Sequence, residues 1–245
     1  MKSLIAASLL VFSTTTLAAN LSDLDYITEV YPPFNYEERG ELKGIAVDFL
    51  EAATKAAGES ISRDQVKLQP WARGYATALS EPNTVLFSTT RTAEREDKFK
   101  WVGPITDTKV VVWAPKSKEI TINNASDFAD YKVGVVRDDV GQHLLETMGV
   151  GKKSIRLSPK PDLLAKQLAA GRIDMWAYEE NVSAYIMSQS NIDTSQFEVV
   201  HVLNESQLYY SLSNNTPDSY VEKLQAGVDQ AIMDGTLDEI KNNYK

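Results

Sequence analysis

Short apolar runs alternate with amphipathic segments in the first part of the chain. Apolar runs at residues 24–30, 66–69 and 84–87 have the length of strands. Residues 45–57 and 70–79 place apolar side chains at helical spacing. This alternation predicts strands and helices in the order typical of α/β proteins.

The same alternation continues after residue 130. It predicts a mostly parallel sheet, because parallel strands need helical crossovers between them. Expected strands cover residues 131–137, 154–157 and 173–178, and expected helices begin at Asp138-Asp139, Pro161 and Glu179.

Three further strands and two helices are expected around and after this unit. Residues 107–115 contain the continuous apolar run Val110–Trp113, and residues 197–202 and 208–212 are strand-like. A threonine followed by proline at 216–217 suits a helix start, and a capping box begins the last helix at Thr236. We find no repeat of fixed period.

Length and composition limit the class of protein. A chain of 245 residues fits one large domain or two of roughly 100 to 120 residues. Apolar residues at 43% and charged residues at 24% are ordinary globular values. The net charge of −9 argues against a nucleic-acid-binding protein, which usually presents a basic face.

The N-terminus has the pattern of a secretory signal peptide. A basic start at Lys2 precedes an apolar run, residues 4–12, and the small residues before Ala19 suit cleavage after Ala18 or Ala19. The apolar run is shorter than the roughly 20 residues that a membrane span needs. A buried N-terminal helix is the alternative. With no cysteine to carry a disulfide or a lipid, we expect a soluble periplasmic protein.

One polar stretch could bind an anion. Residues 87–97 pass from an apolar strand into a charged, helix-compatible segment that contains Ser88, Thr90, Arg91 and Arg95. Hydroxyls, free N–H groups and a guanidinium at a strand-to-helix junction can bind a carboxylate. The alternative is a solvated turn with surface arginines.

Seven segments in a fixed order give the chain its resemblance to a known family. They are Tyr31–Phe34, Gly40–Leu50, Pro70–Arg73, Ser88–Arg95, Val102–Ile105, Lys132–Val135 and Gly171–Asp174. Together they resemble the bacterial extracellular solute-binding proteins of family 3, the amino-acid-binding receptors of ABC importers. The resemblance covers essentially all of the chain after residue 20.

The resemblance implies an α/β fold of the two-lobed periplasmic-binding-protein type (type II-like). Each lobe is then a mostly parallel sheet flanked by helices, and two crossover strands join the lobes. We expect a signal peptide at 1–19, a discontinuous first lobe at 20–109 and 210–245, and a second lobe at 110–209.

The resemblance also assigns roles to residues between the lobes. Arg95 matches the position that binds the ligand's α-carboxylate, and Ser88 and Thr90 match positions that contact its polar groups. Glu179 matches the acid that binds the α-ammonium group. Tyr31 and Trp71 match the residues that enclose the side chain, although each could be an ordinary core aromatic.

Some positions depart from the family pattern or stay open. Asp138-Asp139-Val140 replaces the usual Gly-Thr-Thr at the start of a helix, which weakens the carboxylate contacts expected from this lobe. Together with Glu179 and Glu180, these acids favour a cationic ligand. Arg73 either reaches an acidic ligand side chain or pairs with a neighbouring acid. The alternative for Glu179 is a surface acid at the start of a helix, where the helix dipole favours a negative charge.

These features predict a periplasmic receptor that passes a small polar solute, most simply an amino acid, to an ABC permease. We expect a monomer with no cofactor, no metal, no catalytic residue and no nucleic-acid partner. An enzyme on this fold, with Glu179 as its acid or base, is the first alternative. A sensory module that acts on a separate signalling partner is the second.

Overall fold

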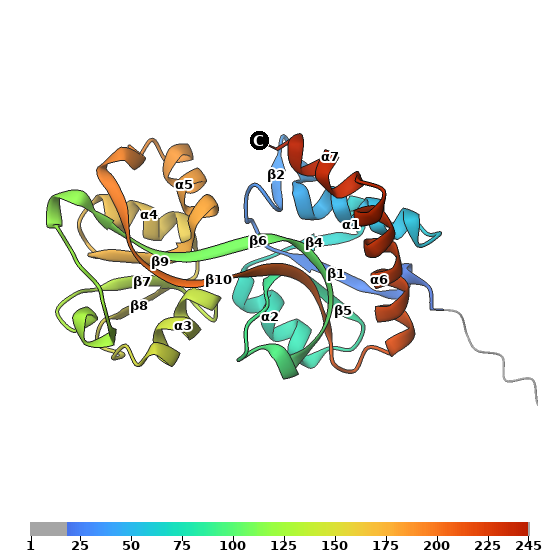
Figure 1. Ribbon diagram of the computed structural model, residues 1–245, viewed down its shortest axis with the longest axis horizontal. Coiled ribbons are helices and arrows are strands. Elements are labelled where there is room, and N and C mark those ends of the chain that lie inside the picture. The colour runs from blue at the N-terminus through green and yellow to red at the C-terminus, as the bar shows by residue number, and fades with distance from the viewer. Residues whose placement is uncertain (1–18, 245) are drawn as a thin grey trace, which may run out of the picture.

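Two lobes joined by two long strands make up the molecule (Figure 1). The computed structural model describes residues 19–244. The crossover strands are β6 (Phe99–Pro115) and β10 (Phe197–Ser213), which pair with each other in antiparallel orientation. Apart from Ala19, the predicted signal peptide lies outside the described residues. No described helix is long and apolar enough to cross a membrane.

A single sheet of eight strands runs through both lobes in the order β4-β1-β5-β10-β6-β9-β7-β8. The strands of lobe 1 and of lobe 2 are each parallel among themselves, and only the crossover strands run antiparallel to their neighbours. The shorter strands are β1 (Asp25–Thr28), β4 (Val66–Leu68), β5 (Thr84–Thr90), β7 (Val133–Val136), β8 (Ile155–Ser158) and β9 (Met175–Glu179). A separate hairpin consists of β2 (Tyr36–Glu38) and β3 (Glu41–Lys43).

Helices flank the strands of each lobe. Lobe 1 carries α1 (Ile45–Ala56), α2 (Trp71–Ser80), α6 (Asp218–Met233) and α7 (Thr236–Asn242), and lobe 2 carries α3 (Val140–Met148), α4 (Pro161–Ala169) and α5 (Glu180–Gln189). Short 3-10 turns lie at Leu21–Asp23, Arg63–Gln65, Glu96–Lys98, Lys116–Lys118, Ala125–Phe128 and Thr194–Gln196. The predicted fold class is confirmed. The lobe boundaries predicted at 109/110 and 209/210 fall inside β6 and β10.

Three local predictions were wrong. The strands expected at 197–202 and 208–212 are one strand, β10, because pairing with β6 continues through the polar residues between them. The strand expected at 24–30 is limited to Asp25–Thr28. No α-helix follows Arg95, where the sequence indicated a strand-to-helix junction: the chain forms only the 3-10 turn Glu96–Lys98.

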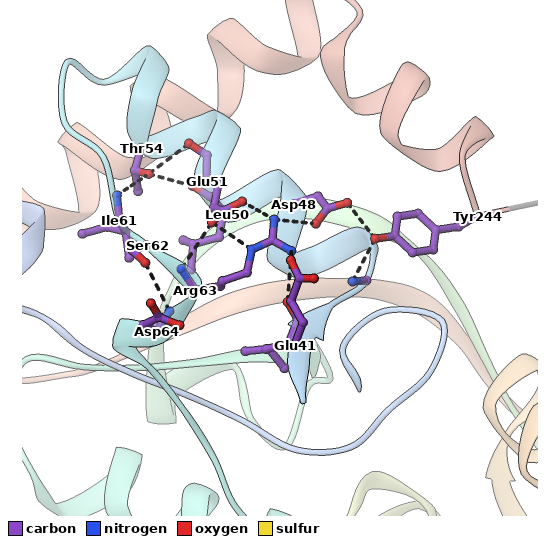
Figure 2. Close-up of polar contacts among 12 residues, drawn as sticks. Glu41, Asp48, Leu50, Glu51, Thr54, Ile61, Ser62, Arg63, Asp64 and Tyr244 are labelled. Carbon is purple, nitrogen blue, oxygen red and sulfur yellow. Dashed lines mark hydrogen bonds and ion pairs between the residues drawn. The ribbon is translucent and has the colours of Figure 1, made fainter. Parts of the chain in front are cut away.

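Arg63 ties the hairpin to α1 in lobe 1 (Figure 2). Its guanidinium contacts Glu51 at 2.5 Å, Asp48 at 3.3 Å and Glu41 at 3.2 Å. The hydroxyl of Tyr244 donates to Asp48 at 2.6 Å and accepts from the N–H of Gly44 at 3.0 Å. These contacts hold the C-terminal end of the chain against the start of α1.

Close packing of α1 on α6 depends on Gly227. A Cβ at this position would lie 2.1 Å from the carbonyl oxygen of Ala53 in α1. Because the clash is with backbone, it can be relieved only by moving a helix.

We therefore expect Gly227→Ala to destabilise the protein by about 1–3 kcal/mol despite the better helix propensity of alanine. Gly151→Ala is the matched control, since nothing lies within 4 Å of a Cβ built there. Chemical denaturation of both variants measures the effect. A Gly227→Ala variant as stable as Gly151→Ala would refute this view of the helix contact.

Candidate ligand site between the lobes

The two lobes touch directly across the space between them. The indole N–H of Trp71, at the start of α2, donates to the carbonyl of Asp138 in lobe 2 at 2.8 Å. The ring of Tyr31 meets that of Tyr178 edge-on, with centroids 5.6 Å apart. These contacts join the ends of strands from opposite lobes, so the structure has a closed cleft.

Polar and aromatic side chains of both lobes are buried in this cleft. We call the following residues the interlobe cluster: Glu29, Tyr31, Trp71, Arg95, Asp139 and Tyr178. Each of them is at most 7% exposed. These side chains lie near one another because residues that follow β1, β5 and β7 reach the same edge of the sheet.

Arg95 is a buried cation without an acidic partner. It is 1% exposed, and its Cζ lies 5.1 Å from the ring centroids of both Trp71 and Tyr75. Its Nη1 donates to the carbonyl of Thr90 at 3.3 Å, whereas Nε and Nη2 have no hydrogen-bond partner. The stacked rings therefore fix a guanidinium whose remaining donors are available to an anion.

Arg91, four residues earlier in the same loop, is an arginine whose guanidinium has a carboxylate partner. It also stacks on two rings, those of Trp101 and Tyr209. Its guanidinium, however, binds Glu96 through both Nε at 2.8 Å and Nη2 at 2.5 Å. Arg95 has no such carboxylate among the described residues, and this is the difference between the two arginines.

Asp139 is the complementary anion from lobe 2. It occupies the N-cap position of α3 without a capping hydrogen bond from its side chain, and it is 4% exposed. Its Oδ2 has no hydrogen-bond partner. Burial raises its pKa, although Arg95 and the N–H groups of Val140 and Gly141 oppose the shift. No ion pair joins Asp139 to Arg95 in the part of the chain that the structure describes.

Sequence reasoning missed Glu29, which lies in the loop that leaves β1. It is 7% exposed, and burial together with the nearby charge of Asp139 raises its pKa well above the ordinary value, while Arg95 acts in the opposite sense. One signal was present: Glu29 lies two residues before Tyr31, at the strand end where ligands collect in α/β sheets.

Two further aromatic residues, Tyr178 in the cluster and Tyr75 beside it, were also missed. Tyr178 directly precedes Glu179, and its buried hydroxyl has no hydrogen-bond partner. Tyr75 lies one helical turn after Trp71 and completes the stack around Arg95, with centroids 5.5 Å apart. Helical spacing from Trp71 could have indicated Tyr75.

Ser88 and Thr90, the two predicted hydroxyl residues, lie beside the cluster but differ in whether the hydroxyl already forms a hydrogen bond. Ser88 forms a bulge in β5, because Phe87 and Thr89 pair with successive residues of β10, and its φ is 60°. The bulge directs its hydroxyl to donate to the side-chain oxygen of Asn35, so that hydroxyl is already used. Thr90 is 2% exposed, and its hydroxyl has no hydrogen bond to a described residue.

Glu179 is fully buried and serves α5 as its N-cap. Its Oε2 accepts from the N–H of Val182 at 2.7 Å, and its Oε1 lies 3.4 Å from Nδ2 of Asn181. Burial raises its pKa to about 7, against the effect of these hydrogen bonds. It is therefore a buried capping residue rather than the surface acid of the alternative interpretation.

Arg73 and Asp138 lie outside the interlobe cluster in different ways. Arg73 is exposed on α2 and is not brought to the buried charges. Asp138 has a φ of 58° and contributes its carbonyl to Trp71, while its side chain is only half-buried. Among residues 19–244, no group of three histidine, aspartate or glutamate side chains could hold a metal ion.

The raised pKa of Glu179 predicts a pH-dependent stability. The folded protein holds this proton up to about pH 7, whereas the unfolded chain releases it near 4.5. Stability from this group is therefore full at acid pH and is lost as the pH rises from about 4.5 to 7, by up to about 3 kcal/mol.

Glu179→Gln keeps an oxygen for the Val182 N–H and removes the titration. We expect the difference in unfolding free energy between this variant and the wild type to grow in favour of the variant over that pH range. Glu180→Gln is the matched control, since it removes the neighbouring carboxylate, which pairs with Lys109 at 3.2 Å. A Glu179→Gln difference that is constant with pH would contradict the assignment.

Known structures share this architecture at low sequence identity. A histidine kinase sensor domain with similarity to periplasmic binding proteins matches with a TM-score of 0.78 and 18% identity, covering 90% of this chain and 95% of that one. The arginine-, lysine-, histidine-binding protein ArtJ from Geobacillus stearothermophilus matches with a TM-score of 0.72 and 20% identity, covering 90% and 94%. At these identities the likeness concerns the fold.

An amino acid ABC transporter substrate-binding protein, AbpA from Streptococcus pneumoniae, solved with L-arginine, matches with a TM-score of 0.72 and 16% identity over 91% of this chain and 95% of that one. No curated protein matches the sequence. The family model described as bacterial extracellular solute-binding proteins, family 3, matches residues 26–245. The chain therefore belongs to family 3 of the bacterial extracellular solute-binding proteins.

Proposed function

We propose that this solute-binding protein captures an amino acid between its lobes and delivers it to an ABC permease in the inner membrane. One observation carries the proposal. Arg95 from lobe 1 and Asp139 from lobe 2 are buried in the same cleft, with opposite charges and unpartnered atoms, and without an ion pair between them. An amino acid zwitterion supplies the two missing partners.

The energetics favour this pairing. A buried polar or charged group without a partner costs free energy, and hydrogen bonds to charged groups contribute about 1.5–3 kcal/mol each. Two or three such bonds and the burial of apolar surface are enough for micromolar affinity, roughly 8 kcal/mol. The ligand would replace unfavourable desolvation with paired charges.

The cluster suggests a role for each side chain. Arg95 would bind the α-carboxylate through Nε and Nη2, with the Thr90 hydroxyl beside it. Asp139 is a better partner for the α-ammonium than Glu179, because Oδ2 of Asp139 is unpartnered and the Glu179 carboxylate caps α5. Tyr31 and Trp71 would enclose the rest of the ligand.

A ligand held by both lobes would stabilise the closed state, which a permease could then distinguish from the open one. The family is extracellular by description, and the predicted signal peptide supports a periplasmic location. ArtJ and AbpA, by their titles, bind amino acids, which supports the same ligand class here. We expect the protein to act as a monomer.

A sensory role is the second candidate, because the histidine kinase sensor domain has the same fold. The ligand would be bound in the same way, and the partner would be a signalling protein instead of a permease. Solute uptake by cells with and without the gene separates the two roles. We propose no catalytic role, and recovery of the ligand unchanged after incubation tests that point.

Replacing Arg95 tests the proposal. Arg95→Met keeps an apolar chain between Trp71 and Tyr75 but removes the carboxylate donors, so we expect at least a 100-fold loss of affinity for any amino acid that binds the wild type, roughly 3 kcal/mol. Arg91→Met is the matched control, because Arg91 also stacks on two rings but pairs with Glu96. Its affinity should stay within about threefold of the wild type.

Isothermal titration calorimetry with a panel of amino acids measures both variants. Circular dichroism of each variant shows whether it is folded. Equal loss of affinity in the two variants, or binding by Arg95→Met at wild-type strength, would rule out Arg95 as the carboxylate-binding residue.

A further inference from the structure

A histidine and a glutamate from opposite lobes lie against each other beside the cleft. Nδ1 of His143, in α3 of lobe 2, is 3.2 Å from Oε2 of Glu94, in the loop that follows β5 of lobe 1. The ring of His143 also meets that of Tyr75, in α2, with centroids 6.2 Å apart. Figure 1 shows α2 and α3 on the same side of the crossover strands. Because these contacts link opposite lobes, opening of the cleft would break them.

The other ion pairs of residues 19–244 do not join the lobes in this way. Lys109 pairs with Glu180 at 3.2 Å, but Lys109 belongs to the crossover strand β6. The rest each lie within one lobe. Among the described residues, His143 and Glu94 are therefore the charged pair that forms when the lobes close.

The strength of this contact depends on the charge of His143. Its Nδ1 is buried and has no hydrogen-bond partner among the described residues, so its approach to Glu94 lacks the geometry of a hydrogen bond. A neutral imidazole thus gains little from Glu94, whereas an imidazolium gains a direct charge attraction. Histidine is the side chain that ordinarily changes its charge between about pH 5 and 8.

Glu94 stays negative over that range. Burial raises its pKa, but Lys98, His143 and Arg95 outweigh burial and lower the pKa below its ordinary value. Its Oε1 accepts a hydrogen bond from Lys98, which leaves Oε2 for His143. The side chains of His143 and Glu94 are 19% and 38% exposed, so we expect a moderate attraction that salt weakens.

Other groups near His143 act on it differently in the open and closed states. Asp139 lies one turn earlier on the same helix, so its interaction with His143 does not require closure. Arg95 and Lys98, on the loop of Glu94, repel an imidazolium and reduce the gain, although Lys98 is itself paired with Glu94. Tyr75 is the contact from α2.

The strands that pack on α3 contribute apolar side chains. Val112, Val135 and Ala177 pack with Leu145 of α3. Glu179, at the end of β9, caps α5. Glu94 is therefore the negative group that closure brings to His143.

We propose that His143 and Glu94 form a pH-dependent latch between the lobes, in which protonation of His143 stabilises the closed cleft and retention of the solute. The closed state, with Glu94 beside the imidazole, binds the proton more tightly than the open state. Closure is therefore favoured at acid pH, and this contribution is lost as the pH rises through the range in which histidine titrates. The inference concerns closure and does not depend on which solute is bound.

Calorimetry at about pH 5.5 and about pH 8 tests the latch, with a panel amino acid whose own charges do not change in this range. Other groups titrate as well, so the quantity compared is the ratio of the two affinities. We expect this ratio to be about two- to fivefold higher in the wild type than in His143→Gln. Glu94→Gln should lower the ratio by the same factor, and the double variant should lower it no further.

His201→Gln is the matched control. His201 is the second of the two histidines of the chain, and its Nδ1 lies 3.2 Å from the carbonyl of Ile122 in the same lobe. This variant should keep the wild-type ratio. A ratio that His143→Gln leaves unchanged, or an effect of His143→Gln that persists in full beside Glu94→Gln, would refute the latch.

A measurement of closure itself separates the latch from the proposed function. The chain has no cysteine, so Ala76→Cys in α2 and Thr147→Cys in α3, both exposed positions, can carry a single pair of spin labels. Pulsed electron paramagnetic resonance of the unliganded protein should show a larger closed fraction at the lower pH, and Glu94→Gln should remove the difference. Should no amino acid bind, or a histidine variant not fold, an equal closed fraction at both pH values would overturn the inference.

Discussion

Unpaired charge inside a closed cleft is the constraint on which the rest of the structure depends. Arg95 and Asp139 lie on different lobes, both are buried, and among the described residues they form no ion pair with each other. In the proposed function, a complementary ligand would pair these charges and so favour the closed state. Ligand binding and closure of the lobes would then be coupled by electrostatics.

The fold supplies the rigid parts that this coupling needs. β6 and β10 pass through both lobes and pair with each other along most of their length, so the lobes share one sheet. The charged residues follow strand ends on either side of these crossover strands. Aromatic stacking on Trp71 and Tyr75 then fixes the guanidinium of Arg95, so in the proposed function little side-chain entropy would be lost on ligand binding.

Much of the fold could be predicted from the sequence, because strands and helices alternate with clear apolar periodicity and the segments occur in the order of a known family. Arg95, Tyr31 and Trp71, which the sequence indicated as site residues, are buried between the lobes, and their role in ligand binding stays a prediction. The continuity of β10 could not be predicted, since polar residues 204–207 form strand only through pairing with β6. Glu29 was missed because a single acid after a strand has many possible roles, and its burial between the lobes follows only from the fold.

The most direct test is a crystal structure of the protein with a bound amino acid, chosen from the calorimetry panel because it binds the wild type. The account predicts its α-carboxylate within hydrogen-bond distance of Nε and Nη2 of Arg95 and its α-ammonium group at Oδ2 of Asp139. A ligand bound elsewhere, with those three atoms still unpartnered, would contradict it.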